Sequence, residues 1–330
     1  MNPNRMSRRG FNAAAGAGIA LAALSPLANA QSAFPSKPIR IVVPFAAGGP
    51  TDLMARAIAR NMAPSLGQPV IVDNKPGGGG VIGMSEIARG PADGYAMVFP
   101  SIFAVTNPAL MPNYPFDTLR DFAPLTVVGF IPHAVVVKPD FPARNLQELV
   151  EMAKARPGSL SYGSSGNGTS AHLGAALFVQ RAGIRAVHVP YRGAGPAVQD
   201  LLGGQIQFMF LDMSSALAQI KAGKLRALAV APKSRFTGLP DVPTVAEQGY
   251  PGFDVHGWYG LLLKAGTPAP VVQRLYAEVR RSLDAPDVRE IFQAQGIEPG
   301  GMPPADFTAL IRDDLALWKR TVEQLNITLQ

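Results

Sequence analysis

The sequence predicts an α/β protein built as two lobes, and three observations carry that prediction. Short β-branched runs alternate with helix-length segments along most of the 330 residues, a pattern that indicates βαβ units and parallel sheets. About 300 residues remain after removal of an N-terminal export signal, a length that suits two lobes better than one core. Glycine-rich loops of the same kind follow strands in both halves of the chain.

Each predicted strand is a short apolar run bounded by turn residues, and each predicted helix has apolar residues at helical spacing. The strands are expected at Ile39–Pro44, Val70–Asp73, Tyr95–Phe99, Leu125–Gly129, Ala134–Lys138, Leu160–Tyr162, Ala186–Val189, Ile206–Phe210, Leu225–Val230 and Trp258–Leu263. The helices are expected at 51–65, 81–89, 145–155, 169–182, 195–203, 214–222, 268–284, 287–295 and 304–325. Right-handed connections would place the strand-to-helix loops along one edge of each sheet, where open α/β sheets bind ligands.

Two features place the lobe boundaries. The apolar runs of Leu125–Lys138 are interrupted by Phe130-Ile-Pro-His133, a segment suited to crossing between lobes. A turn-rich passage, Gly249–Asp254, precedes the strand that would return. We therefore predict one lobe from residues 31–130 plus 254–330 and a second from 131–253, with a hinge and a ligand cleft between them. Receptors that close around a ligand have this layout.

The N-terminus has the pattern of an export signal. Arg5, Arg8 and Arg9 precede an apolar run from Ala13 to Leu24, and small residues end at Ala30. The run is too short to span a bilayer. Ser7-Arg8-Arg9-Gly10-Phe11 matches the start of a twin-arginine signal, and an ordinary Sec signal is the alternative. We predict a signal peptide at residues 1–30, cleavage near Ala30 and a periplasmic mature protein.

Composition excludes several functions. Cleavage removes three arginines and no acidic residue, which lowers the formal net charge from +7 to +4. That excess is small and no basic run with interleaved aromatic residues accompanies it, so we expect no nucleic-acid partner. The absence of cysteine excludes disulfides, a thiolate nucleophile and thiolate metal ligands. The four histidines lack H-x-x-H spacing, and we expect no metal site.

Two glycine loops are candidate anion sites. The strand ending at Pro44 is followed by Phe45-Ala-Ala-Gly-Gly-Pro-Thr-Asp52, and a second loop is Gly163-Ser-Ser-Gly-Asn-Gly-Thr-Ser170. Each would put backbone N–H groups and the positive end of a helix dipole beside a strand end. The alternative is a tight strand–helix connection in which Thr51 or Asp52 caps the helix. A cap is the better reading of Asp52, because its carboxylate would repel an anion.

Two further positions lie at the same predicted edge. In His188-Val-Pro-Tyr191-Arg192-Gly193, the tyrosine and arginine could contact a carboxylate, or line the hinge and the surface. Asp212 could accept a ligand hydroxyl or amino group, or cap the helix that begins near Ser214. His172 is best read as a buried structural histidine.

The patterns that would indicate an enzyme are incomplete. Gly78, Gly80 and Gly83 form G-x-G-x-x-G, the dinucleotide fingerprint. Asn74-Lys75-Pro76 separates it from the strand, and no acidic residue follows at the expected distance. Close packing of a helix on a sheet explains these glycines more simply. The loop at 163–170 is not G-x-S-x-G, so a nucleophile elbow is not supported.

Along nearly its whole mature length, the chain resembles the Bug-type solute receptors of the tripartite tricarboxylate transporter system. The matching segments include Pro44-Phe45, Gly48-Gly49, Asp52, Asn74-Lys75-Pro76-Gly77, Asp93-Gly94-Tyr95, Tyr114-Pro115-Phe116-Asp117, Gly163-Ser164, Gly168-Thr169, His172-Leu173, His188-Val189-Pro190-Tyr191, Asp200-Leu201-Leu202-Gly203-Gly204-Gln205, Leu225-Arg226-Ala227-Leu228-Ala229-Val230, Pro240-Asp241-Val242-Pro243-Thr244 and Gly266-Thr267-Pro268. The resemblance implies a type II periplasmic-binding-protein fold with a carboxylate in the interlobe cleft, held by loop amides, hydroxyls and waters.

Carried onto this chain, the resemblance implies ligand contacts from both lobes. The first lobe would contribute Phe45, Ala47, Gly48, Thr51 and Asp52, and the second Ser164, Gly168, Thr169, Tyr191, Gly193 and Asp212. Ala46-Ala47 stands where relatives often have proline, and Ser165 and Asn167 occupy variable positions. The identity of the ligand therefore stays open.

The resulting hypothesis is an extracytoplasmic receptor for a small carboxylate: a di- or tricarboxylate, an acidic amino acid or an aromatic acid. It would work as a monomer without cofactor or catalysis and deliver its ligand to integral membrane subunits of a tripartite tricarboxylate transporter. The alternatives are an exported α/β hydrolase or dehydrogenase, and a ligand sensor for a signalling partner.

Overall fold

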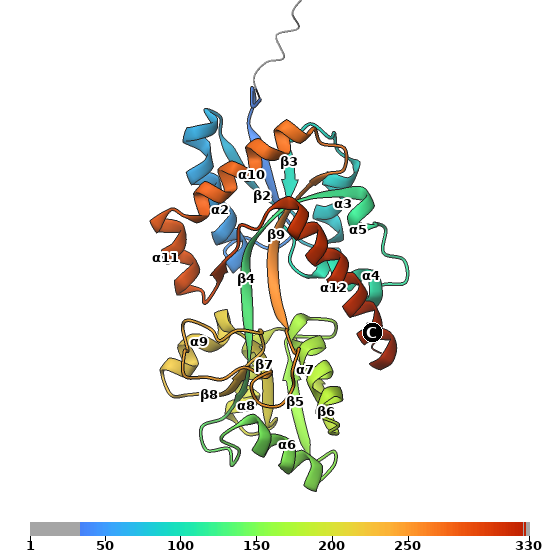
Figure 1. The fold of residues 1–330 in the computed structure, drawn as a ribbon, viewed down its shortest axis with the longest axis vertical. Coiled ribbons are helices and arrows are strands. Elements are labelled where there is room, and N and C mark those ends of the chain that lie inside the picture. Colours follow the sequence, from blue (N-terminus) through green and yellow to red (C-terminus); the bar gives the residue numbers. More distant parts are fainter. Residues whose placement is uncertain (1–33, 326, 328–330) are drawn as a thin grey trace, which may run out of the picture. The chain divides into compact units, whose positions relative to one another are not determined.

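In the computed structural model, two β-sheets share one long strand (Figure 1). The structure describes residues 34–325 and residue 327. The predicted signal peptide, residues 1–30 with its cleavage site, lies outside the described residues. The fold belongs to the unit formed by residues 37–330, which is distinct from the unit of residues 1–36. In the described part of the chain, no helix combines the length and apolar character needed to cross a membrane.

Strands and helices alternate along the described chain, as predicted. The strands are β1 (Ile39–Val43), β2 (Val70–Asn74), β3 (Ala96–Val98), β4 (Phe122–Val137), β5 (Leu160–Ser164), β6 (Ala186–Pro190), β7 (Phe208–Asp212), β8 (Arg226–Val230), β9 (His256–Lys264) and β10 (Glu298–Pro299). The helices are α2 (Pro50–Leu66), η1 (Gly78–Gly80, a 3₁₀ turn), α3 (Val81–Arg89), α4 (Phe103–Leu110), α5 (Thr118–Asp121), α6 (Leu146–Ala155), α7 (Ser170–Arg181), α8 (Ala194–Leu202), α9 (Met213–Lys221), α10 (Ala269–Leu283), α11 (Pro286–Ala294) and α12 (Pro304–Leu325).

Each lobe is organised around one sheet. The first sheet has the order β2-β1-β3-β9-β4, in which β1 is parallel to β2 and β3 whereas β9 is antiparallel to β3 and β4. The second continues β4-β7-β5-β6, with β5 parallel to β6 and β7 and with β4 antiparallel to β7 and β8. The α/β class and the two lobes are confirmed. Both sheets are mixed, not wholly parallel.

Strand β4 corrects one prediction from the sequence. The two strands expected on either side of Phe130-Ile-Pro-His133 are a single strand that runs through Pro132. Up to Pro132, β4 pairs with β9, and from His133 onward it pairs with β7. A proline lacks the N–H that a sheet ladder uses, and Pro132 lies where β4 changes partners, so the strand continues past it. The lobe boundaries 130/131 and 253/254 stay a prediction.

The central strands are buried because helices cover both faces of much of the sheets, whereas the edge strands β2 and β6 are partly exposed. Val42, Trp258 and Phe307 belong to one large apolar cluster, and Met209 and Leu211 of β7 belong to another on the second sheet. Figure 1 shows β4 and β9 running side by side between the two sheets. Residues on these two strands therefore lie at the junction of the lobes.

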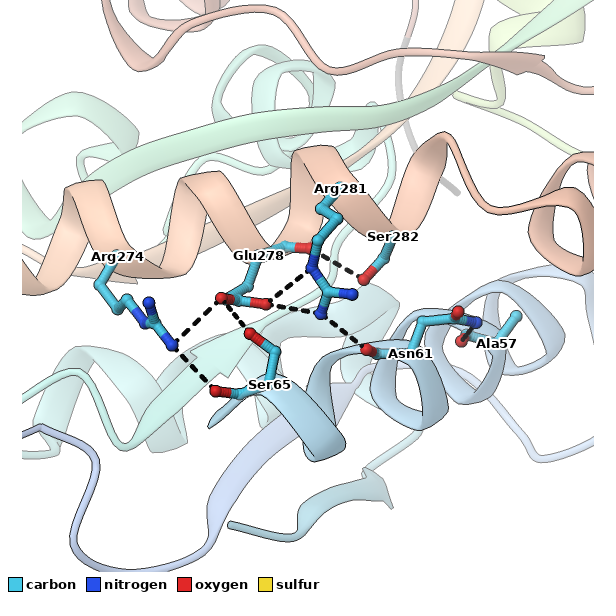
Figure 2. A network of polar contacts seen from close by, with 7 residues as sticks. All are labelled: Ala57, Asn61, Ser65, Arg274, Glu278, Arg281 and Ser282. Atoms are coloured by element: carbon cyan, nitrogen blue, oxygen red, sulfur yellow. Dashed lines mark hydrogen bonds and ion pairs between the residues drawn. The ribbon is translucent and has the colours of Figure 1, made fainter. Parts of the chain in front are cut away.

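A buried carboxylate fastens α10 to α2 (Figure 2). Glu278 of α10 is 4% exposed, and its Oε1 accepts the Ser65 hydroxyl at 2.6 Å. Arg281 and Arg274 lie on either side, with N–O distances of 2.7 and 3.2 Å to the carboxylate. Burial raises the pKa of Glu278, but the hydrogen bonds from Ser65 and Arg281 outweigh it and hold the pKa below its ordinary value. This network fixes the helix that follows the glycine loop of β1.

Candidate ligand-binding site

A cavity of about 710 Å³ opens where elements of both sheets meet. Pockets for small ligands commonly measure roughly 300–1,000 Å³. The cavity is lined by Phe45, Pro50, Gly78, Gly79, Ser101, Ile102, Phe103, Thr106, Asn107, Leu110, Met111, Ile131, His133, Ser165, Asn167, Gly168, Thr169, Ser170, Ala194, Asp212, Ser214, Ser215, Gly257, Trp258 and Tyr259. Of the residues predicted to contact a ligand, Phe45, Gly168, Thr169 and Asp212 line it.

The N-terminal turn of α7 forms the polar part of the lining. Thr169 is the N-cap of this helix, and its hydroxyl accepts the N–H of His172 at 3.3 Å and donates to the Gly166 carbonyl at 2.8 Å. Ser170 and Ala171 lie in the same first turn, before His172. A helix supplies no internal acceptor for the N–H groups of this turn. The helix dipole makes this end attractive to an anion. The local structure therefore has the features that the sequence predicted for the second glycine loop.

Two histidines support this loop from behind. Gly168 donates its N–H to Nδ1 of His172 at 3.1 Å. Ser164 is fully buried and pairs with Nε2 of His188 at 2.7 Å. Burial lowers the pKa of each histidine to about 4, so both rings are neutral at pH 7. His172 is thus the buried structural residue that the sequence favoured, and Ser164 does not line the cavity.

Helix α9 begins at the same cavity, and Asp212 is its N-cap. The carboxylate accepts the N–H of Ser215 at 3.0 Å and hydrogen bonds from the hydroxyls of Ser214 and Ser215. The capping alternative for Asp212 is confirmed. Because Asp212 already occupies this helix end with a negative charge, α7 is the better of the two for an anion.

Tyr191 and Gly193 shape the start of α8. The Tyr191 hydroxyl donates to Asp200 at 2.7 Å. Tyr191 and Gly193 do not line the cavity, although the neighbouring Ala194 does. Gly193 is the N-cap of α8 with φ of 108°, a conformation that favours glycine. Arg192 is exposed and does not line the cavity.

On the first sheet, Asp52 organises the glycine loop from inside. Its carboxylate accepts the Gly48 N–H and Arg56 Nε, both at 2.9 Å, and the Asn74 amide at 3.0 Å. Burial raises the pKa of Asp52, and these hydrogen bonds outweigh it and lower the pKa. The predicted cap is wrong in detail, because Gly49 is the N-cap of α2 and makes no side-chain cap.

The other predicted residues of this loop lie beside the cavity without lining it. Ala47 and Gly48 are exposed, and Thr51 is buried and hydrogen-bonded to Tyr259. Burial raises the pKa of Tyr259 to about 12. Phe45 alone of the predicted set from this loop lines the cavity.

Sequence reasoning missed the wall contributed by α4 and the residues before it. Ile102, Phe103, Asn107, Leu110 and Met111 all line the cavity, yet no element was predicted between 100 and 118. Their spacing of three and four residues is helical, but Pro108 inside the helix hides the pattern.

The glycines that resemble a dinucleotide fingerprint serve packing. A Cβ on Gly83 would lie 2.9 Å from Cβ of Pro44, and a Cβ on Gly80 would lie 2.3 Å from the Phe103 ring. The simpler reading of these glycines, close approach of a helix to its neighbours, fits both distances. Gly78 and Gly79 line the cavity.

A serine and a histidine of the lining are hydrogen-bonded without forming a catalytic triad. Ser170 Oγ lies 3.0 Å from Nε2 of His133. Burial lowers the pKa of His133 to about 4, which makes it a poor base at neutral pH. No carboxylate of the described chain hydrogen-bonds its Nδ1. The same described residues contain no cluster of three or more metal-ligating side chains.

Comparison with known proteins identifies the family. The model of the tripartite tricarboxylate transporter family receptor matches residues 54–327. Protein BugT of Bordetella pertussis strain Tohama I is 38% identical over 299 residues, which cover 90% of this chain and 92% of BugT.

Two solved structures of similar proteins contain organic acids. MatC from Rhodopseudomonas palustris, with bound malate, is 32% identical with a TM-score of 0.72, covering 88% of this chain and 100% of MatC. An R. palustris protein solved with adipate is 31% identical with a TM-score of 0.76, covering 89% and 99%. The family consists of solute receptors, not enzymes, and this chain belongs to the tripartite tricarboxylate transporter receptor family.

Proposed function

We propose that this protein is a periplasmic receptor that captures a small carboxylate in the cavity and delivers it to the integral membrane subunits of a tripartite tricarboxylate transporter. One observation carries the proposal: the N-terminal turn of α7, with the hydroxyls of Thr169 and Ser170, opens on a cavity of about 710 Å³. The malate and adipate bound by the two similar R. palustris proteins support it.

The carboxylate would be held by neutral donors. The first-turn N–H groups of α7 and the Ser170 hydroxyl offer hydrogen bonds, each contributing about 0.5–1.5 kcal/mol net between neutral groups and roughly twice that to an anion. The Thr169 hydroxyl donates to Gly166 and holds this turn in place. Several such bonds support a micromolar complex, about −8 kcal/mol, after ordering costs. Closure of the lobes would bring the Phe45 side of the cavity onto the same ligand.

We assign different roles to the residues predicted from the sequence. Phe45, Gly168, Thr169 and Asp212 are proposed to face the ligand, since they line the cavity. The remaining predicted residues are proposed to shape the three strand-to-helix loops on which they lie: Ala47, Gly48, Thr51, Asp52, Ser164, Tyr191 and Gly193. The domain division at 130/131 and 253/254, the monomeric state and cleavage near Ala30 complete the proposal.

Calorimetry on the mature protein, residues 31–330, tests this function. A panel of mono-, di- and tricarboxylates is titrated beside the matched amides, which keep the shape of each acid and lack its charge. We expect at least one acid to bind and its amide to bind at least tenfold more weakly. Equal binding of acid and amide, or binding by a nucleotide alone, would contradict the proposal.

Variants locate the site. Thr169→Val removes the capping hydroxyl at nearly constant volume, loosens the first turn of α7 and is expected to weaken acid binding at least fivefold. Thr308→Val is the matched control, because the Thr308 hydroxyl donates to Pro304 within α12 and does not line the cavity. If both variants bind the acid as the unmodified protein does, Thr169 is not a ligand contact. Ligand-dependent co-purification of a permease subunit, as opposed to a signalling protein, then distinguishes transport from sensing.

A further inference from the structure

The cavity wall contributed by the first sheet and α4 is aromatic. The Phe45 and Phe103 rings meet edge to face with centroids 5.8 Å apart and planes at 64°. Phe45 also meets Tyr259 at 6.3 Å and 81°. All three rings line the cavity, and Leu110 and Met111 extend the apolar surface. Such edge-to-face pairs hold aromatic rings in a defined geometry.

The position of Phe103 is fixed by contacts between α4 and the glycine turn before α3. Its ring lies against Gly80, where a Cβ would approach Cζ to 2.3 Å. One turn along α4, the Asn107 amide donates to the Gly79 carbonyl at 2.9 Å. These contacts join α4 to the glycine turn before α3, so the aromatic wall is a formed surface.

The lining of the cavity contains an acidic side chain and no positively charged one. No lysine or arginine is among the residues that line the cavity. The polar side chains that the segment around Phe103 adds to the lining are Ser101, Thr106 and Asn107, which are neutral, and the Asn107 amide donates one of its two N–H groups to Gly79. Asp212 is the acidic residue of the lining, and its carboxylate is already hydrogen-bonded to Ser214 and Ser215. Burying an ionised group against apolar surface without a partner is costly.

The aromatic wall and the start of α7, which both line the cavity, indicate one class of ligand. We propose that the ligand is a monocarboxylic acid with a ring-sized apolar body, whose carboxylate faces the start of α7 and whose body packs against Phe45, Phe103 and Tyr259. This inference rests on the proposed carboxylate-binding function. It separates this chain from the two R. palustris proteins, which were solved with the dicarboxylic acids malate and adipate.

Titration of four probe acids tests the inference. Benzoate and cyclohexanecarboxylate are expected to bind at least tenfold more tightly than adipate and malate. Adipate or malate binding as tightly as benzoate would overturn the ligand class and leave the carboxylate receptor standing. No binding by any of the four acids would likewise overturn the ligand class, whereas benzamide binding as tightly as benzoate would overturn the proposed function itself.

A charge introduced into the wall provides the second test. Met111 lines the cavity and is half-buried, so Met111→Arg places a cation on the apolar side of the cavity. We expect the ratio of adipate to benzoate affinity to rise at least tenfold in this variant and to change less than twofold in Met111→Gln, the neutral control. An unchanged ratio in Met111→Arg would show that the far end of the ligand does not lie there.

A loss of ring surface should weaken the binding of a ring-bearing acid. Phe103→Leu is expected to weaken benzoate binding at least fivefold. Phe116→Leu is the control, because Phe116 packs against Tyr114 and Phe122 and does not line the cavity. Equal benzoate affinities in the two variants would remove Phe103 from the site.

Discussion

The imidazole rings of His172 and His188 stack with centroids 3.8 Å apart and planes within 6° of parallel. His172 accepts the Gly168 N–H and His188 pairs with Ser164, so the stack supports the loop that carries Thr169. Burial lowers both pKa values to about 4, and the neighbouring His172 lowers that of His188 further. The stack is therefore built from two neutral rings.

Acid should weaken the fold through this pair. A histidine with a folded-state pKa of about 4 and an ordinary value of 6.5 binds its proton more readily in the unfolded state. Its contribution to stability is present above pH 6.5, is lost as the pH falls towards 4, and changes no further below that. We expect a loss on the order of a few kcal/mol across this range for the pair.

Urea unfolding at pH 7.5 and pH 5 measures that loss. His188→Gln removes one titrating ring and should make the free energy of unfolding less dependent on pH than it is in the unmodified protein. His256→Gln, outside the stack, serves as the control. An unchanged pH dependence in His188→Gln would show that the stack does not couple protonation to folding.

A second buried group should act in the opposite direction. Asp314 of α12 accepts the Trp258 indole N–H at 2.7 Å, and burial raises its pKa to about 6. Its ionisation costs stability above pH 6 and not below its ordinary value of 3.8. Asp314→Asn keeps an acceptor for Trp258, so we expect it to stabilise the fold at pH 8 by about 1–3 kcal/mol and to change little at pH 4. Calorimetric melting at both pH values checks this, and destabilisation at pH 8 would contradict it.

The contact between Gly80 and Phe103 predicts a steric defect. Gly80→Ala would set a Cβ 2.3 Å from the ring at a φ of +93°. We expect a loss of about 2–4 kcal/mol from backbone strain and displacement of the ring. Gly67→Ala is the matched control: its φ is also positive, at +64°, and nothing lies within 4 Å of the added Cβ. Equal losses by urea unfolding would show that the ring makes no difference.

Removal of the buried carboxylate in Figure 2 should loosen α10 from α2. Glu278→Ala leaves Arg274, Arg281 and Ser65 without their shared acceptor, and we expect a loss of about 1–3 kcal/mol, moderated because both arginines are half-exposed. Asp284→Ala removes an exposed acceptor of Arg280 and Arg289 and is the control. Urea midpoints separate the two, and similar midpoints would mean that the buried network contributes no more than a surface pair.

Most elements could be predicted because their signals are local. The helix predicted at 145–155 is α6, Leu146–Ala155, capped by Asn145, and the strand expected at Leu225–Val230 is β8, Arg226–Val230. The break predicted at Phe130–His133 was wrong because Pro132 dominates the local pattern. Pairing with β9 and then with β7 overrides that pattern.

The residues of the site were predicted less completely, because contacts between separate segments decide which of them line the cavity. A glycine loop before a helix indicates an anion site, and Gly168 and Thr169, which line the cavity, were predicted from that pattern. Whether Ser164 or Tyr191 faces a ligand depends on partners that no local pattern identifies. The Ser164 hydroxyl pairs with His188, and the Tyr191 hydroxyl donates to Asp200. The aromatic wall needs Phe45, Phe103 and Tyr259 to converge from three separate segments.

The sequence by itself determined the α/β class, the strand–helix alternation and the glycine loops that precede helices, because hydrophobic period, glycine and capping residues act within one turn or strand. Tertiary structure alone decided that β4 is one strand shared by both sheets, that the hydroxyls of Ser164 and Tyr191 bond inside the second lobe, and that α4 forms a cavity wall. Those outcomes depend on packing and hydrogen bonds between distant segments, and no local pattern encodes which partner a buried side chain meets.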